Sequence, residues 1–186
     1  RKSGNSMINL RRLNRKIAVS YLESYEQLSN FSETINNKKY DCLTSTLLYA
    51  YFLEKLGYKY TIRETNYHIY ILVNLEKKQV LIEPTDPYHG FIWEKKYINK
   101  RIATYKASNH SENEGFLSKV NIDREVNLFQ LAGLQYYNKA VKLFNMQRFE
   151  EAINSLKKSM MVYDCERNRM FMAFSLEVMN GKKTFD

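Results

Sequence analysis

The chain has 186 residues, of which 44% are hydrophobic and 26% are charged, a balance that excludes an intrinsically disordered protein. Charged or amide residues interrupt every apolar run before it reaches the roughly 20 residues of a membrane helix, so we predict a soluble chain without a membrane-spanning segment. The formal charge of +9 could attract nucleic acid, yet no zinc-finger spacing or RNA-recognition motif accompanies it, and we predict no nucleic-acid binding.

The first residues and the cysteines set further limits. The chain begins at Arg1 without an initiator Met, so a targeting segment could be missing and the compartment is left unassigned. Cys42 and Cys165 are too few and too far apart for a disulfide framework or a cysteine metal site. The three histidines lack any short ligand spacing, and we predict no metal and no cofactor.

The first third of the chain has the pattern of two helices. Apolar residues recur at helical spacing over residues 10–28, and the polar segment 29–39 predicts a loop, with or without a short helical turn. A second helix is expected over residues 41–56, ending at Gly57 in a left-handed cap. Asp41 is the expected N-cap, which would place Cys42 at the first helical position.

The middle of the chain predicts a small sheet. Residues 58–63, 68–75 and 80–83 are rich in Ile, Val and Tyr, and the polar residues 76–79 have the length of a hairpin loop. Residues 107–115 are the most linker-like stretch of the sequence.

The last third predicts three helices, over residues 128–144, 149–163 and 167–179. Part of this region resembles a tetratricopeptide repeat unit, in which small and aromatic residues let two antiparallel helices pack closely. The matching residues are Ala140, Leu143, Phe149, Ala152, Leu156 and Ser159. A single unit is visible, so we predict a helical hairpin followed by a third helix.

A candidate catalytic group emerges from the first half of the chain. A thiol attacks acyl carbons as thiolate, and a helix N-terminus with a neighbouring imidazole lowers its pKa, so Cys42 is the candidate nucleophile. His68 opens one predicted strand and Glu83 ends the next. Pairing through the 76–79 loop places them on one sheet face but opposes Glu83 to Leu72, so direct contact with His68 needs a bulge or a tighter loop. Asp86 is the alternative carboxylate, and both stay open.

Three segments resemble the transglutaminase-like superfamily of cysteine hydrolases. Tyr40-Asp41-Cys42 and the helix ending in Leu56-Gly57 are similar to that family's nucleophile helix. The segments His68-Ile69-Tyr70 and Glu83-Pro84-Thr85 resemble its histidine strand and its Asp-Pro-Thr motif, here with Glu in place of Asp.

This resemblance implies a papain-like α+β fold in which a nucleophile helix packs on a small antiparallel sheet. It also implies a Cys42–His68 pair oriented by Glu83, or by Asp86, that acts on amide bonds of a peptide or protein through a thioester. We therefore predict a transglutaminase-like α+β domain over residues 1–106, a linker over 107–127 and a tetratricopeptide-like helical segment over 128–186. The alternative is a catalytically silent module that binds a protein partner through this fold and its C-terminal helices.

Overall fold

A computed structural model of the chain describes residues 6–108 and 122–181, which form two compact units. The described part of the first unit, residues 6–108 and 122–128, mixes helices and strands, and that of the second, residues 129–181, is helical. The described residues contain seven α-helices and a five-stranded antiparallel sheet, so the predicted α+β class is confirmed. None of these helices combines the length and the apolar character that crossing a membrane requires.

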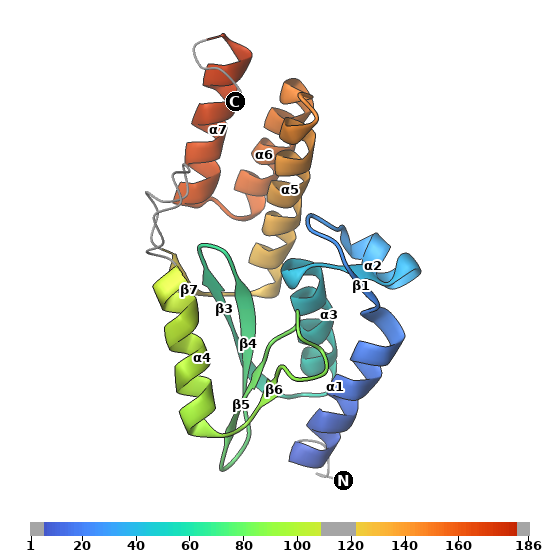
Figure 1. Cartoon of the computed structure of the whole chain (residues 1–186). Helices are drawn as coiled ribbons and strands as arrows, with labels where there is room; N and C mark the ends of the chain where they lie inside the picture. The colour runs from blue at the N-terminus through green and yellow to red at the C-terminus, as the bar shows by residue number, and fades with distance from the viewer. Residues whose placement is uncertain (1–5, 109–121, 182–186) are drawn as a thin grey trace. The chain divides into compact units, whose positions relative to one another are not determined.

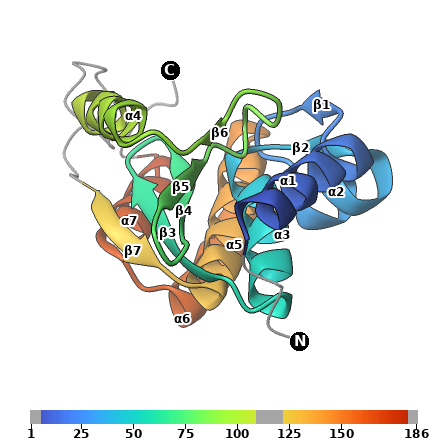
Figure 2. The same cartoon turned by 90° about the horizontal axis from the view of Figure 1, so that it is seen from below.

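The sheet of the first unit has the strand order β6-β5-β4-β3-β7, and each neighbouring pair is antiparallel. The strands are β3 (Lys59–Thr65), β4 (Ile69–Asn74), β5 (Gln79–Ile82), β6 (Phe91–Ile92) and β7 (Asp123–Val126). Figure 2 shows this sheet between α4 (Lys95–Ser108) on one side and α1 (Met7–Tyr21) with α3 (Cys42–Lys55) on the other. The candidate catalytic residues lie in this unit.

Alternation along the central strands fills the core on both faces of the sheet. Side chains point to opposite faces at successive positions, so Ile71 and Val73 share one face and Tyr70 lies on the other. All three side chains are almost completely buried. On the Tyr70 face, Leu81 of β5 and Ile98 of α4 complete a buried cluster, which holds α4 against the sheet.

The start of α3 follows the prediction. Asp41 has an extended backbone, and its side chain accepts a hydrogen bond from the Thr44 amide at 2.8 Å, while Thr44 Oγ1 accepts one from the Asp41 amide at 3.0 Å. Cys42 is therefore the first helical residue, as predicted. Gly57 has a φ of 71°, the left-handed conformation that glycine adopts without strain, and this prediction is also confirmed.

The segment before α3 differs from the prediction in two ways. The first helix ends at Tyr21 instead of residue 28, because Ser24–Tyr25 forms strand β1, which pairs in parallel with β2 (Lys39–Tyr40). The predicted loop contains the helix α2 (Phe31–Asn37), whose capping box joins Asn30 and Glu33. The spacing of Asn30 and Glu33 is the sequence signal for the start of this helix.

The predicted linker 107–127 needs a correction at both ends, since residues 107 and 108 are the last two of α4. Residues 123–126 form β7, which pairs with β3, whereas residues 109–121 of that segment lie outside the described residues. The side chain of Asp123 forms ion pairs with Arg63 of β3 and with Lys106 of α4. Four residues with few apolar side chains carry little strand signal alone, and the neighbouring strand supplies the hydrogen bonds that order them.

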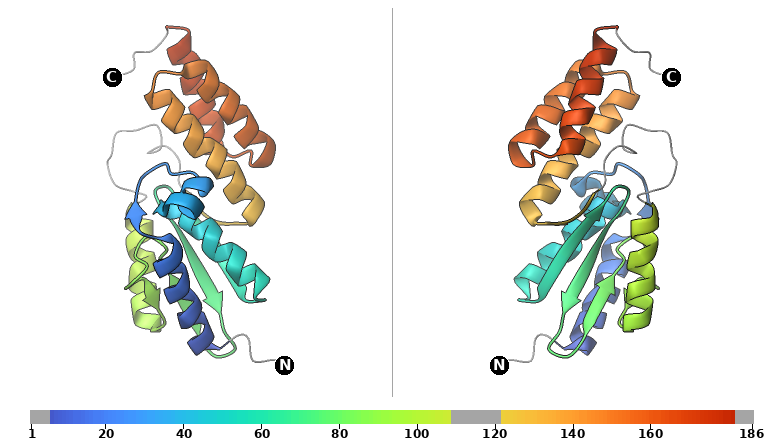
Figure 3. Two further views of the ribbon diagram at one scale, coloured as in Figure 1. Left: turned by 90° about the vertical axis from the view of Figure 1, so that its right-hand side faces the viewer. Right: turned by 90° about the vertical axis from the view of Figure 1, so that its left-hand side faces the viewer.

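The second unit consists of α5 (Leu128–Asn145), α6 (Phe149–Val162) and α7 (Glu166–Met179), which lie alongside one another in Figure 3. Ala140, Ala152 and Leu156 are fully buried between them. Ser159 is fully buried as well, and its hydroxyl donates a hydrogen bond to the Gly133 carbonyl oxygen at 2.7 Å. The predicted helices are thus present, while the likeness to tetratricopeptide repeats stays a prediction.

Candidate functional site

Four chain segments bring the candidate residues to one end of the first unit. The hairpin of β4 and β5 is antiparallel, so the residue before β4 and the residue after β5 lie at the same edge of the sheet. Figure 1 shows the N-terminus of α3 and the C-terminal part of α4 at this same end. Cys42, His68, Glu83 and Tyr105 occupy those four positions.

The hairpin register brings His68 and Glu83 together. Leu72 pairs with Leu81 and Ile71 with Ile82, so the predicted pairing of Leu72 with Glu83 is wrong by two residues. The cause is a tighter loop: the Leu75 amide donates to the Lys78 carbonyl oxygen at 2.8 Å, which closes the turn at residues 76 and 77. The sequence predicted that direct contact between His68 and Glu83 needs either a bulge or a tighter loop, and the structure has the tighter loop.

His68 is held by both its backbone and its ring. Its amide donates to Thr65 Oγ1 at 3.1 Å, and its carbonyl oxygen accepts from the Thr65 amide at 2.8 Å across the β3–β4 turn. Nε2 of His68 lies 2.5 Å from Oε2 of Glu83. Because a carboxylate can only accept, Nε2 carries the hydrogen and Nδ1 is the nitrogen able to take a proton.

Glu83 is an anchored, nearly buried carboxylate. Its Oε1 accepts hydrogen bonds from the Thr85 amide at 3.1 Å and the Thr85 hydroxyl at 2.5 Å, and its Oε2 accepts one from the Tyr105 hydroxyl. Burial alone would raise the pKa of Glu83, but the hydrogen bond and charge of His68, with those of Thr85 and Tyr105, hold the pKa below its usual value. Glu83 is therefore ionised at neutral pH.

Asp86, the alternative carboxylate, contacts another histidine. Its Oδ1 accepts a hydrogen bond from the His89 amide at 3.0 Å and lies 3.4 Å from His89 Nδ1. The chain turns back between them, since the Gly90 amide donates to the Asp86 carbonyl oxygen at 2.7 Å and the Glu83 amide to the Gly90 carbonyl oxygen at 2.8 Å. Of the two carboxylates left open by the sequence, Glu83 is the one in contact with His68.

The Cys42 thiol does not have the pKa expected from the sequence. The amides of Leu43 and Cys42 itself hydrogen-bond the sulfur and favour the thiolate, as a helix N-terminus should. Burial outweighs them and, with the negative charges of Asp41 and Glu83, raises the pKa of Cys42 to about 12. The predicted lowering of this pKa is wrong, and the resting thiol is protonated at pH 7.

The protonated thiol has a measurable consequence for alkylation. We expect iodoacetamide to label Cys42 at pH 7 about 100-fold more slowly than a free thiol of pKa near 8.5, after allowing for the greater nucleophilicity of a more basic thiolate. The labelling rate should rise steadily to pH 10, because the thiolate fraction grows until the pH passes the pKa. Peptide mapping separates Cys42 from Cys165. A plateau below pH 8 would contradict the raised pKa.

Among the described residues, no hydrogen bond joins the Cys42 thiol to His68. Catalytic hydrogen bonds are often long in unliganded proteins and tighten when substrate binds. The charge of Glu83 nevertheless acts on the Cys42 thiol, so the sulfur and the His68–Glu83 pair share one electrostatic environment. The part of the chain described here holds no group of three His, Cys, Asp or Glu side chains arranged for a metal ion.

Tyr25 is a further residue of this environment that the sequence analysis missed. Strand β1 places it beside Tyr40, two residues before Cys42, and the two rings meet edge to face at 5.8 Å. Burial raises the pKa of Tyr25 to about 12, with smaller contributions from the charges of Cys42, Asp41 and Glu83. Its hydroxyl therefore remains a donor at neutral pH. No signal marked Tyr25, because the sequence assigned it to a helix.

The remaining contacts of the site vary in how visible they were in the sequence. Thr85 follows Glu83 by two residues and belongs to the Glu83-Pro84-Thr85 segment that carries the family resemblance. Its contact with Glu83 is therefore between near neighbours in the chain. Tyr105 lies on α4, where its ring packs 4.7 Å from that of His68, and nothing in the sequence linked it to Glu83.

Comparison of the chain with protein-family models, with curated proteins and with solved structures gives no match.

Proposed function

We propose that this protein is a transglutaminase-like cysteine hydrolase or acyltransferase that acts on amide bonds of a peptide or protein. The observation that carries the proposal is the His68–Glu83 pair, with Nε2 and Oε2 2.5 Å apart, beside the helix N-terminus that presents Cys42. Thr85 and Tyr105 fix the carboxylate, so the imidazole is oriented before a substrate arrives.

The first chemical step begins with a neutral thiol. His68 Nδ1 takes the proton of Cys42 as the sulfur attacks the carbonyl carbon, and Glu83 stabilises the positive imidazole that forms. The carbonyl oxygen becomes an oxyanion, which the amides at the start of α3 and the Tyr25 hydroxyl stabilise. The C–N bond then breaks, and His68 gives its proton to the leaving amine, which leaves an acyl thioester on Cys42.

The second step decides the type of enzyme. Water that loses a proton to His68 releases a carboxylic acid, which is proteolysis or deamidation, whereas an amine in its place forms a new amide and crosslinks two molecules. The thiol of Cys42 is regenerated in each case. These activities share the Cys42–His68–Glu83 machinery, and the proposal covers all three.

An activated ester tests the proposal without knowledge of the natural substrate. We expect 4-nitrophenyl acetate to transfer one acetyl group to Cys42, with release of 4-nitrophenolate, at least about tenfold faster than it acetylates glutathione at pH 7. Intact-mass measurement with peptide mapping locates the acetyl group. Cys42→Ala should lose this adduct, and Cys165→Ser should keep it. Acetylation of Cys42 no faster than that of glutathione would overturn the proposal.

A second candidate function is favoured by the pKa of Cys42. A thiol with a pKa near 12 is a poor resting nucleophile, which suits a catalytically silent module that binds a protein partner. The tetratricopeptide-like helices α5, α6 and α7 would hold that partner. Slow alkylation and slow acetylation together support this second function, whereas slow alkylation with fast acetylation supports the enzyme.

A further inference from the structure

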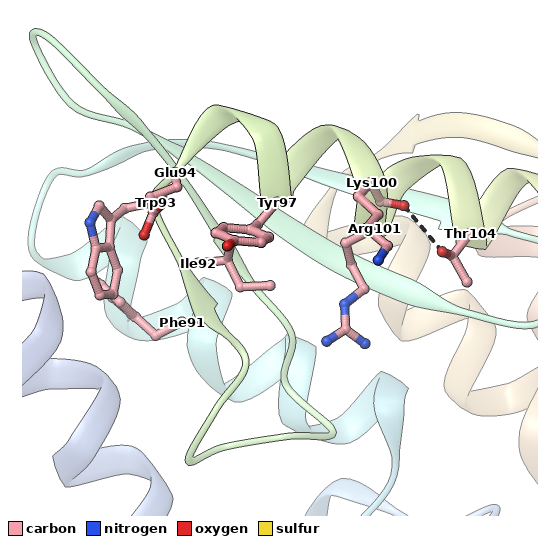
Figure 4. Close-up of a pocket in the computed structure, with 8 residues that line it drawn as sticks. All are labelled: Phe91, Ile92, Trp93, Glu94, Tyr97, Lys100, Arg101 and Thr104. Carbon is pink, nitrogen blue, oxygen red and sulfur yellow. Dashed lines mark hydrogen bonds between the residues drawn. The ribbon is translucent and has the colours of Figure 1, made fainter.

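A groove of about 450 Å³ runs along α4 in the first unit. It is lined by Phe91, Ile92, Trp93, Glu94, Tyr97, Lys100, Arg101 and Thr104. Figure 4 shows the aromatic side chains at one end and the basic ones farther along the helix. The rings are accessible, since Trp93 is 39% and Tyr97 51% exposed. The groove thus offers aromatic surface followed by positive charge.

The aromatic end is built by two segments and is preorganised. The Arg11 guanidinium of α1 lies 4.5 Å from the centroid of the Trp93 ring and 5.7 Å from that of Phe91. Stacking of this kind orients an indole and leaves its other surfaces available to a second ring. Tyr97 stands on the first turn of α4 beside them.

The basic end lies next to the candidate catalytic residues. Tyr97, Lys100, Arg101 and Thr104 share one face of α4, because residues three and four apart in a helix are neighbours. Arg101 precedes Tyr105 by one turn, and its positive charge acts on the Tyr105 hydroxyl, which donates to Glu83. The groove therefore leads from Trp93 toward the His68–Glu83 pair.

We propose that this groove is a substrate subsite that binds an extended acidic peptide segment carrying an aromatic residue. The inference rests on the proposed function and names the substrate class of the same site. Carboxylates of the peptide pair with Lys100 and Arg101, and its aromatic side chain packs on Trp93 and Tyr97.

Dimensions and charge support a peptide over a nucleic acid. A helix rises 1.5 Å per residue, so α4 from Lys95 to Arg101 spans about 9 Å along its axis, which about three extended peptide residues cover, and Trp93 lies two residues before this stretch. Glu94 and the Arg11 guanidinium both lie at the aromatic end, so the charge there is mixed and offers no continuous positive surface for a chain with a phosphate at every nucleotide. A peptide can place its carboxylates at the basic end alone.

Trp93 is the only tryptophan of the chain and reports directly on this groove. The probe is an octapeptide without Trp that carries one Phe and, three and four residues away, two Glu. It is titrated at low salt into the Cys42→Ala variant of the 186-residue chain. We expect a saturable change in Trp93 fluorescence. We expect the Kd to rise about tenfold when both Glu of the peptide are replaced by Gln, because two attractive ion pairs are lost. The K100E/R101E double variant should raise the Kd by a similar factor for the same reason.

The matched control is K157E/K158E, which reverses an adjacent exposed pair of lysines on α6 of the other unit. Its Kd should change less than twofold. The inference is overturned if K157E/K158E raises the Kd as much as K100E/R101E does, or if the peptide causes no change in Trp93 fluorescence. It is also overturned if an eight-nucleotide single strand binds more tightly than the peptide. Acetylation of Cys42 by 4-nitrophenyl acetate does not use the groove, so the two proposals can fail separately. Peptide binding without acetylation contradicts only the proposed enzyme activity. Acetylation without peptide binding contradicts only the proposed subsite.

Discussion

Replacing His68 with Asn is expected to slow the acetylation of Cys42 by 4-nitrophenyl acetate about 10²- to 10⁴-fold at pH 7. A general base contributes this much to a reaction in which a proton moves in the transition state. The decrease in rate should be at the upper end of that range, because burial keeps the Cys42 thiol protonated and a base must remove its proton. Single-turnover release of 4-nitrophenolate measures the rate.

We expect Glu83→Gln to change two reactions of Cys42 in opposite directions. Acetylation should slow, because the amide cannot stabilise a positive His68. Alkylation by iodoacetamide between pH 7 and 10 should become faster, because one of the negative charges that raise the pKa of Cys42 is removed. Unfolding would also expose Cys42 as a faster-labelled free thiol, so both rates are compared only after denaturant unfolding has shown that Glu83→Gln is as stable as the parent.

Asp86→Asn is the matched control for Glu83. It removes the same charge from a carboxylate three residues along the chain that contacts His89 instead of His68. We expect its acetylation rate to stay within a factor of two of the parent. If Asp86→Asn slows acetylation as much as Glu83→Gln does, the assignment of Glu83 as the orienting carboxylate is wrong.

Replacing Gly90 with Ala is expected to destabilise the first unit by about 1–3 kcal/mol, the usual cost of overpacking. A Cβ at this position would lie 2.4 Å from the carbonyl oxygens of Asp86 and Glu83 and 2.6 Å from Glu83 Cβ. Two of these three atoms belong to the backbone, so the loop must move. The displaced Glu83 should also slow acetylation of Cys42. Denaturant unfolding and the acetylation assay measure the two effects.

Gly133→Ala is the control that separates a general loss of stability from slower acetylation of Cys42. Its Cβ would lie 2.6 Å from Tyr163 Cβ within the helical unit, so this variant should also lose stability. Acetylation of Cys42 should be unchanged, because the candidate site lies in the first unit. A Gly90→Ala protein as stable as the parent would contradict the tight packing behind Glu83.

The loop behind Glu83 is also held from the other side of the sheet. The buried Asn14 side chain donates to the Pro87 carbonyl oxygen at 3.2 Å and accepts from the Tyr49 hydroxyl at 3.0 Å. It thereby ties the loop to both α1 and α3. Asn14 had no visible role in the sequence, where it was one polar residue of an amphipathic helix, because its partners lie 35 and 73 residues away.

The sequence by itself determined the features that depend on neighbours in the chain. Asp41 caps α3 because its side chain reaches an amide three residues on, and Gly57 ends that region because it adopts a positive φ without strain. Segments rich in Ile, Val and Tyr then located the two strands that His68 and Glu83 flank. These patterns also placed Cys42 at a helix N-terminus.

Only the tertiary structure decided the features that depend on residues far apart in the chain. The register of one hairpin selected Glu83 over Asp86, and the packing of β1, α3 and α4 brought Tyr25 and Tyr105 to the site. Burial reversed the expected direction of the Cys42 pKa, because the loss of water around a thiolate outweighs two amide hydrogen bonds. Desolvation is set by everything that surrounds an atom, and local sequence cannot report it.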